Sequence, residues 1–204
     1  AFFNWMRIEK LMFDNPVESV GKKRTDKGQI DYYTQEELEK LREGCQTKRD
    51  RAMIEVLRST GLRVGEFCSI NISDVDFRTG DVWIKREKGG LNTPAFIDEA
   101  AMYYLREYLN EREDDCESLI VGKRAPYSRL KPCGVRAVLK DIARRQGMSC
   151  KVYPHKFRKT LGMTLKNKGY DLGVIQEVLG HTSPATTSKY YAESTSDTLR
   201  SIRR

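Results

Sequence analysis

The chain has 204 residues, enough to bury a core without disulfides, and 32% of them are charged. No apolar run approaches the roughly 18–20 residues of a membrane span, and the first ten residues lack the pattern of a signal peptide. Five cysteines without a C-x-x-C pair argue against a disulfide framework or zinc ribbon. These features exclude membrane and secreted classes and predict a cytoplasmic protein.

The charge balance favours a nucleic-acid partner. Lys and Arg number 37 against 29 Asp and Glu, which leaves a formal net charge of +8. An excess of this size is typical of proteins that bind phosphate backbones, although many basic proteins bind no nucleic acid.

The beginning of the chain predicts a domain boundary. Residues 2–13 have loosely helical spacing of apolar residues, and Asn15-Pro16 is expected to stop this helix. A mixed-charge segment, GKKRTDKGQ, follows without periodicity. We expect residues 1–20 to be the C-terminal end of a truncated domain, residues 21–33 a linker, and residues 34–204 one domain with a tail from residue 192.

Capping and breaking residues predict the first helices of that domain. Thr34 and Glu37 have the spacing of a capping box, so a helix is expected to begin at Gln35. A second helix is expected from about Arg49 to Thr60, because Gly61 follows it.

The pattern then changes to a hairpin. Residues 81–85 and 93–97 read as two short strands, joined by a basic, glycine-rich turn over residues 87–90. Asp98 is then expected to cap a helix that runs to about Arg112, and residues 119–121 are expected to form a short buried strand. A helix through residues 135–143 is ended by Gly147. Helical segments follow from His155, with stops at Gly169 and Gly180 and a new start at Ser183-Pro184. The predicted fold class is α+β, mainly α-helical, with one small antiparallel sheet.

Two clusters offer side chains that suit a phosphate. His155 and Arg158 lie three residues apart, so on a helix they share a face and present a proton donor beside a planar guanidinium. The alternative is a solvated basic face, because Lys156 and Lys159 are neighbours.

Arg63 begins the second cluster. It stands at the start of a helix, with Glu66 three residues later. Glu66 either orients Arg63 toward an anion or forms a surface pair worth less than about 1 kcal/mol. Lys88, in the hairpin turn, is by itself a position where lysines are usually solvated.

The order and spacing of these motifs resemble the tyrosine recombinase, or phage integrase, family. The matching features are TGLRVGEF, the hairpin lysine, HKFR, LGH, and a tyrosine nine residues after the LGH histidine. The resemblance implies the family's catalytic-domain fold for residues 34–204. It also implies that the helix predicted over residues 2–13 is the C-terminal end of a core-binding domain. Phe67, Phe157 and Lys159 depart from residues common in the family, but no reactive group is missing.

By motif position the resemblance implies a catalytic set of Arg63, Lys88, His155, Arg158, His181 and Tyr190. Tyr191 is the rival nucleophile. Neighbouring residues on a helix point about 100° apart, so only one tyrosine can face the site, and the family spacing selects Tyr190.

The implied function is a site-specific DNA recombinase or integrase that cleaves and rejoins DNA through a 3′-phosphotyrosine. The resemblance implies no metal, ATP or other cofactor, and no Asp/Glu cluster suited to Mg²⁺ lies near these residues in the sequence. The implied partners are double-stranded DNA, three further protomers in a tetramer and an accessory directionality factor, with nucleoid association on DNA. An integrase of a mobile element is favoured over a Xer-type chromosome-dimer resolvase, a type IB topoisomerase and a non-catalytic DNA-binding module.

Overall fold

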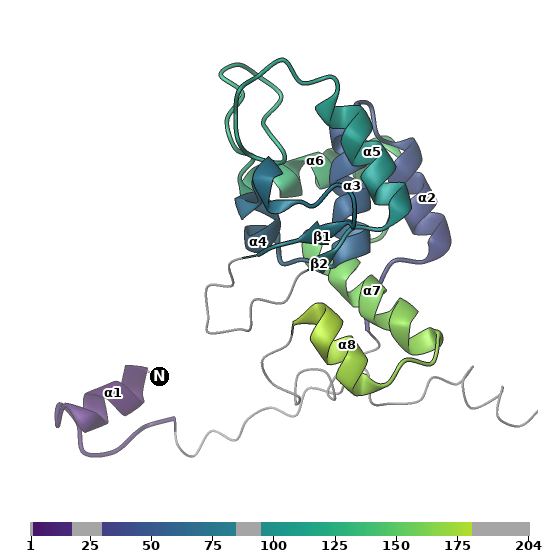
Figure 1. The fold of residues 1–204 in the computed structure, drawn as a ribbon. Coiled ribbons are helices and arrows are strands. Elements are labelled where there is room, and N and C mark those ends of the chain that lie inside the picture. Colours follow the sequence, from purple (N-terminus) through teal and green to yellow (C-terminus); the bar gives the residue numbers. More distant parts are fainter. Residues whose placement is uncertain (1, 18–29, 85–94, 181–204) are drawn as a thin grey trace, which may run out of the picture.

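The computed structural model describes residues 2–17, 30–84 and 95–180 (Figure 1). The described part is mainly helical and contains one two-stranded antiparallel sheet, which confirms the predicted fold class. The elements are α1 (Phe2–Ile8), α2 (Gln35–Glu43), α3 (Lys48–Thr60), α4 (Val64–Ser69), the 3-10 helix η1 (Ile72–Asp74), β1 (Asp81–Val82), β2 (Ala95–Phe96), α5 (Glu99–Leu109), α6 (Pro132–Arg145), α7 (Pro154–Asn167) and α8 (Leu172–Leu179).

The first helix is shorter than its apolar pattern predicts. α1 ends at Ile8, and Lys10 adopts a left-handed conformation with φ of 56°. Leu11 and Phe13, expected inside the helix, are 61% and 99% exposed. No residue of α1 is buried, and a short helix without tertiary packing is not stable enough to extend further.

Helix α3 forms the centre of the core. It packs against α2, α5 and α7 (Figure 1). Its apolar residues between Ala52 and Leu57 are fully buried and share one cluster with Leu105 of α5 and Phe157 of α7. The predicted capping of its neighbours is confirmed: Thr34 and Glu37 form the capping box of α2, and Asp98 caps α5.

The predicted hairpin strands pair as expected but are shorter. Asp81 lies opposite Phe96 and Val82 opposite Ala95, in antiparallel register. The turn over residues 87–90 lies outside the described residues.

The strand predicted over residues 119–121 is wrong. The segment is buried, yet Ser118 and Val121 form only isolated bridges, to Asn71 and Arg129. The segment pairs only with single residues outside the sheet. Its apolar residues therefore indicate burial in the core and not a strand.

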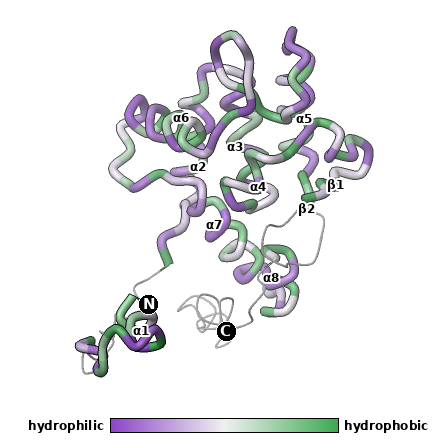
Figure 2. Tube along the Cα trace, turned by 90° about the vertical axis from the view of Figure 1, so that its left-hand side faces the viewer, coloured by the Kyte–Doolittle hydropathy of each residue, from purple (hydrophilic) through white to green (hydrophobic). Residues whose placement is uncertain are grey.

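The C-terminal helices follow the predicted glycine stops. α6, α7 and α8 end just before Gly147, Gly169 and Gly180. Ile175 and Leu179 of α8 pack against Met163 of α7 in a second apolar cluster. Figure 2 shows hydrophobic residues, in green, interspersed with hydrophilic ones along α8. The helix start predicted at Ser183-Pro184 and the tail from residue 192 lie outside the described residues.

All five cysteines are free thiols. Within residues 2–17, 30–84 and 95–180, no helix combines the length and the apolar character that crossing a bilayer requires.

Candidate active site

The glycine at the end of α3 brings that helix against α7. Gly61 adopts the left-handed conformation with φ of 59°, which favours glycine. A Cβ atom there would lie 2.8 Å from Leu161 Cδ2 and 3.5 Å from Arg158 Cα. Both the turn and the close approach therefore require glycine at this position.

Arg158 lies buried beneath this turn. Its side chain donates one hydrogen bond to the Gly61 carbonyl at 3.0 Å and another to the Leu179 carbonyl. These carbonyls lie at the C-terminal ends of α3 and α8, where the helix dipole favours a cation. The two bonds fix the plane of the guanidinium, and they link the ends of α3 and α8 to the Arg158 side chain of α7.

Arg63 stands at the N-terminus of α4, two residues after Gly61. Glu66 accepts a hydrogen bond from the Arg63 guanidinium at 2.8 Å and another from its backbone N–H at 2.9 Å. The Arg63 side chain is 47% exposed. An exposed ion pair adds less than about 1 kcal/mol to stability, so the main effect of Glu66 is to direct the guanidinium.

His155 completes the cluster from the first turn of α7. Partial burial lowers the pKa of its imidazole, and the positive charges of Arg158, Lys159 and Arg63 lower it further. The N-terminal end of the helix dipole acts in the same direction. Three of the predicted residues, Arg63, His155 and Arg158, therefore lie together in a positive field that suits an anion such as phosphate.

We expect the His155 imidazole to titrate below about 6.5 in the free protein and at higher pH when an anion binds beside it. NMR titration of the imidazole C–H signals measures both values, with His155→Gln identifying the resonance. Sulfate should raise the pKa more than chloride does at equal ionic strength. Equal effects of the two salts, or a pKa at or above 6.5 without sulfate, would contradict an anion site.

The interpretation of α7 as a solvated basic face is wrong for Lys156. Its side chain is only 2% exposed, and its ammonium lies 3.0 Å from Asp31 and 3.4 Å from Glu37. Sequence reasoning missed this cluster. Helical phase could have indicated it, because Lys156 lies four and seven residues before the buried Thr160 and Met163.

Lys88, His181, Tyr190 and Tyr191 lie outside the described residues, so their places in the site stay predictions. Among the residues that the structure does describe, no group of three or more His, Cys, Asp or Glu is arranged to hold a metal ion.

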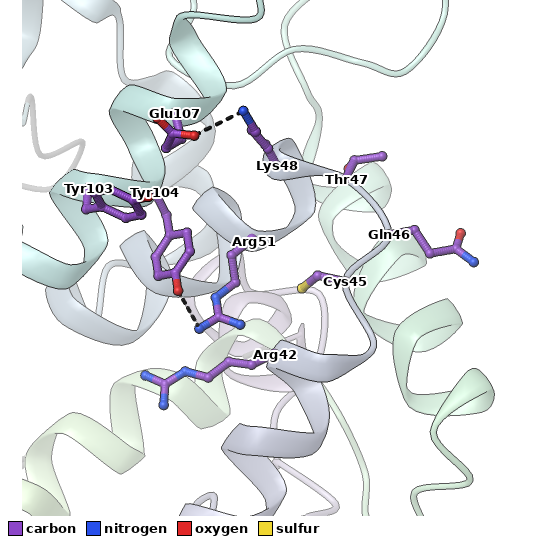
Figure 3. Close-up of a pocket in the computed structure, with 9 residues that line it drawn as sticks. All are labelled: Arg42, Cys45, Gln46, Thr47, Lys48, Arg51, Tyr103, Tyr104 and Glu107. Carbon is purple, nitrogen blue, oxygen red and sulfur yellow. Dashed lines mark hydrogen bonds and ion pairs between the residues drawn. The ribbon is translucent and has the colours of Figure 1, made fainter.

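Two surface hollows lie away from this site. One, of about 270 Å³, lies between α2, α3 and α5, and Figure 3 shows Lys48 directed at Glu107 and Arg51 at Tyr104. The other, of about 350 Å³, lies beside Arg49, Tyr108 and Arg112. Arg63, His155 and Arg158 line neither of these two hollows.

The comparisons with known proteins agree on one family. The model of the phage integrase family matches residues 31–197. Tyrosine recombinase XerA of Pyrococcus furiosus is 36% identical over 160 residues, which are 77% of this chain and 55% of that protein. Tyrosine recombinase XerC of Oceanobacillus iheyensis is 31% identical over 98% of this chain and 68% of its own length. The chain thus spans between half and about two thirds of these relatives.

Solved structures share the fold. The crystal structure of XerA recombinase superposes with a TM-score of 0.75 at 26% identity, over 98% of this chain and 72% of that one. The Tn1549 transposon integrase, in complex with a circular intermediate DNA, superposes with a TM-score of 0.77 at 17% identity, over 98% of this chain and 74% of its own.

Proposed function

The chain belongs to the phage integrase family, and from this premise we propose that it is a site-specific DNA recombinase, a tyrosine-type strand transferase. The observation that carries the proposal is the convergence of Arg63, His155 and Arg158 around the Gly61 turn. These residues come from α4 and α7, which are separated by about 90 residues of sequence, and they match family motifs in order.

The two arginines are proposed to bind the scissile phosphate. Their planar guanidinium groups match the geometry of nonbridging phosphate oxygens. The pentacoordinate transition state carries more negative charge than the ground state, so these contacts strengthen during the reaction. The depressed pKa of His155 keeps the imidazole neutral near pH 7, able to donate one hydrogen bond and to accept a proton.

Tyr190 is the proposed nucleophile. A phenol with a pKa near 10 is only about 0.1% ionised at pH 7, so the site must remove its proton during attack. The phenol oxygen bonds to phosphorus while the bond to the 5′ oxygen breaks. The products are a 3′-phosphotyrosine and a 5′ hydroxyl.

The remaining two residues, Lys88 and His181, are assigned to proton transfer and to hydrogen bonding of the phosphate. Lys88 is the proposed general acid for the departing 5′ oxygen, and His181 supplies a hydrogen bond to the phosphate. The phosphodiester energy stays in the tyrosine linkage, so a second 5′ hydroxyl reseals the strand without ATP. Neither step calls for a metal ion.

Strand exchange between two duplexes needs four protomers, so a tetramer on double-stranded DNA is part of the proposal. The polar tail after Glu193, in which the apolar Leu199 and Ile202 are three residues apart in the sequence, is proposed to contact a neighbouring protomer. An accessory directionality factor is a further proposed partner, and nucleoid association follows from DNA binding.

Two biological roles use this chemistry. The 31% and 36% identical relatives are Xer proteins, which supports a chromosome-dimer resolvase as the alternative to a mobile-element integrase. A plasmid assay separates the roles, because an integrase joins two unlike sites whereas a resolvase acts on two identical sites.

A nicked suicide duplex tests the proposal. The wild-type protein in EDTA and without ATP is expected to form an SDS-resistant adduct at the 3′ side of the break. Loss of the short nicked fragment prevents resealing and traps the adduct. DNA binding without any adduct would identify a binding module instead, and a strict requirement for a divalent metal would contradict the mechanism.

A further inference from the structure

A buried lysine lies next to the candidate site without belonging to it. The Lys156 ammonium lies 3.0 Å from Asp31, 3.4 Å from Glu37 and 4.6 Å from the ring centre of Tyr33. Lysine is among the residues least often buried, and apolar replacements of buried ion pairs are often neutral or stabilising. Stability alone therefore does not explain a lysine at this position.

Two of these partners, Asp31 and Tyr33, belong to residues 30–34, the entry segment that leads into α2, whereas Glu37 lies in the first turn of α2. The entry segment also contacts α7 directly. The ring of Tyr33 packs on Phe157 at 4.7 Å, and its backbone N–H donates to Thr160 Oγ1 at 2.9 Å. Its hydroxyl accepts from the Tyr153 backbone N–H at 3.1 Å. The Tyr153 hydroxyl donates to Asp31 at 2.8 Å. The entry segment thus holds the first two turns of α7.

Titration behaviour agrees with a tight ionic cluster. Burial would raise the pKa of the Asp31 carboxyl, but its bonds to Lys156 and Tyr153 outweigh burial and hold that pKa below its usual value. Burial and the bond to Asp31 raise the pKa of Tyr153 to about 12. Asp31 is therefore a carboxylate and Tyr153 a neutral donor at pH 7.

The same turn of α7 carries the phosphate site. Lys156 lies directly between His155 and Phe157, and Arg158 follows two residues later. A rotation or shift of this turn would move His155 and Arg158 together. Phosphoryl transfer is sensitive to such displacements, because an error of about 1 Å can cost on the order of 100-fold in rate.

We propose that Lys156 is a positioning residue: through Asp31 it fixes the first turn of α7 to the entry segment, through Glu37 it fixes that turn to α2, and so it sets where His155 and Arg158 stand. The role in catalysis rests on the proposed function. The structural part does not, because the position of His155 is measurable without DNA.

The His155 imidazole reports on this geometry. The charged groups that act on its pKa are Arg158 and Lys159 of α7 and Arg63 at the start of α4, and Lys156 is not among them. Loss of the positive charge of Lys156 can only raise the His155 pKa by direct electrostatics, whereas loss of the negative charge of Asp31 can only lower it. A rise of this pKa in both variants therefore reports a movement of α7 relative to its neighbours.

The test compares Lys156→Met with a matched control. Lys156→Met keeps the length of the side chain and removes its charge. Arg49→Met removes another buried cation, the partner of Asp50 at 2.6 Å, at the opposite end of α3 from Gly61.

We expect Lys156→Met to slow adduct formation on the suicide duplex by roughly 10- to 100-fold, with a smaller change in DNA affinity. Its His155 pKa should move toward about 6.5. Lys156→Arg should restore both values, and Arg49→Met should leave both at the wild-type level.

A folded Lys156→Met protein with wild-type cleavage and an unchanged His155 pKa would overturn the proposal. Asp31→Asn is the second variant in case Lys156→Met fails to fold, since the Asp31 side chain is 47% exposed. It should shift the His155 pKa in the same direction, and an unchanged pKa would again overturn the proposal. If neither the wild type nor any variant forms an adduct, the proposed function is wrong. The His155 pKa values of the variants still test the positioning role in that case.

Discussion

Replacing Glu55 by glutamine is expected to lower the free energy of unfolding by about 3–5 kcal/mol. The Glu55 side chain of α3 is fully buried among three arginines: Arg42 at 2.8 Å, Arg58 at 2.7 Å and Arg51 at 3.0 Å. The isosteric amide keeps the volume but removes the charge that compensates these guanidinium groups. Since domains of this kind are stable by only about 5–15 kcal/mol, the loss is large.

The effect should depend on pH in a defined direction. Burial would raise the pKa of Glu55, but its bonds to Arg42 and Arg58 outweigh burial and hold the pKa below the usual value. The stabilisation is therefore complete above about pH 4.3 and is lost as pH falls through the lowered pKa.

Urea unfolding at pH 7 and in acid measures this difference. Glu39→Gln is the control, because Glu39 is 46% exposed and its pair with Arg42 should contribute less than about 1 kcal/mol. A Glu55→Gln protein within 1 kcal/mol of the wild type at pH 7, or a gap that widens in acid, would contradict the assignment of Glu55 as the charge that compensates these three arginines.

Replacing either arginine of the site by alanine is expected to slow cleavage by on the order of 10²–10³-fold, with a smaller loss of DNA affinity. The contacts of Arg63 and Arg158 strengthen as charge builds on the phosphate. Single-turnover adduct formation on the suicide duplex measures the rate, and a mobility shift measures the affinity.

The two arginines should differ in their effect on stability. Arg158→Ala leaves the carbonyls of Gly61 and Leu179 without this donor, a loss of about 1–3 kcal/mol. Arg63→Ala removes only the bond to Glu66 at the surface and should melt like the wild type. Arg158→Lys keeps the charge but not the planar fork, so it should recover little cleavage. Wild-type cleavage by any of these variants would remove that arginine from the site.

Local signals predicted the helix boundaries because the contacts that set them are local. The Thr34 capping box, the Gly61 stop and the Asp98 cap each involve residues within four positions, and all three are confirmed. The apolar pattern of residues 2–13 overestimated α1, since a pattern does not show whether a partner buries it. The apolar run at residues 119–121 is buried as expected but forms no strand, because burial does not require strand pairing.

The order and spacing of the motifs predicted part of the candidate site. Arg63, His155 and Arg158 were assigned from their spacing, and the structure brings them together. Helical phase indicates that Lys156 is buried, but its ionic partners and the contacts of Tyr33 were not predictable, because the residues involved lie about 120 positions apart in the sequence. Such contacts exist only once α7 has packed on the entry segment.

The central claim is tested most directly by identifying which residue is covalently linked to DNA after the suicide substrate has trapped the adduct. Protease and nuclease digestion followed by mass spectrometry should locate the nucleotide on Tyr190. Tyr190→Phe should bind the duplex without forming an adduct, and Tyr191→Phe should still form one. An adduct on Tyr191, or an adduct that survives in Tyr190→Phe, would contradict the account.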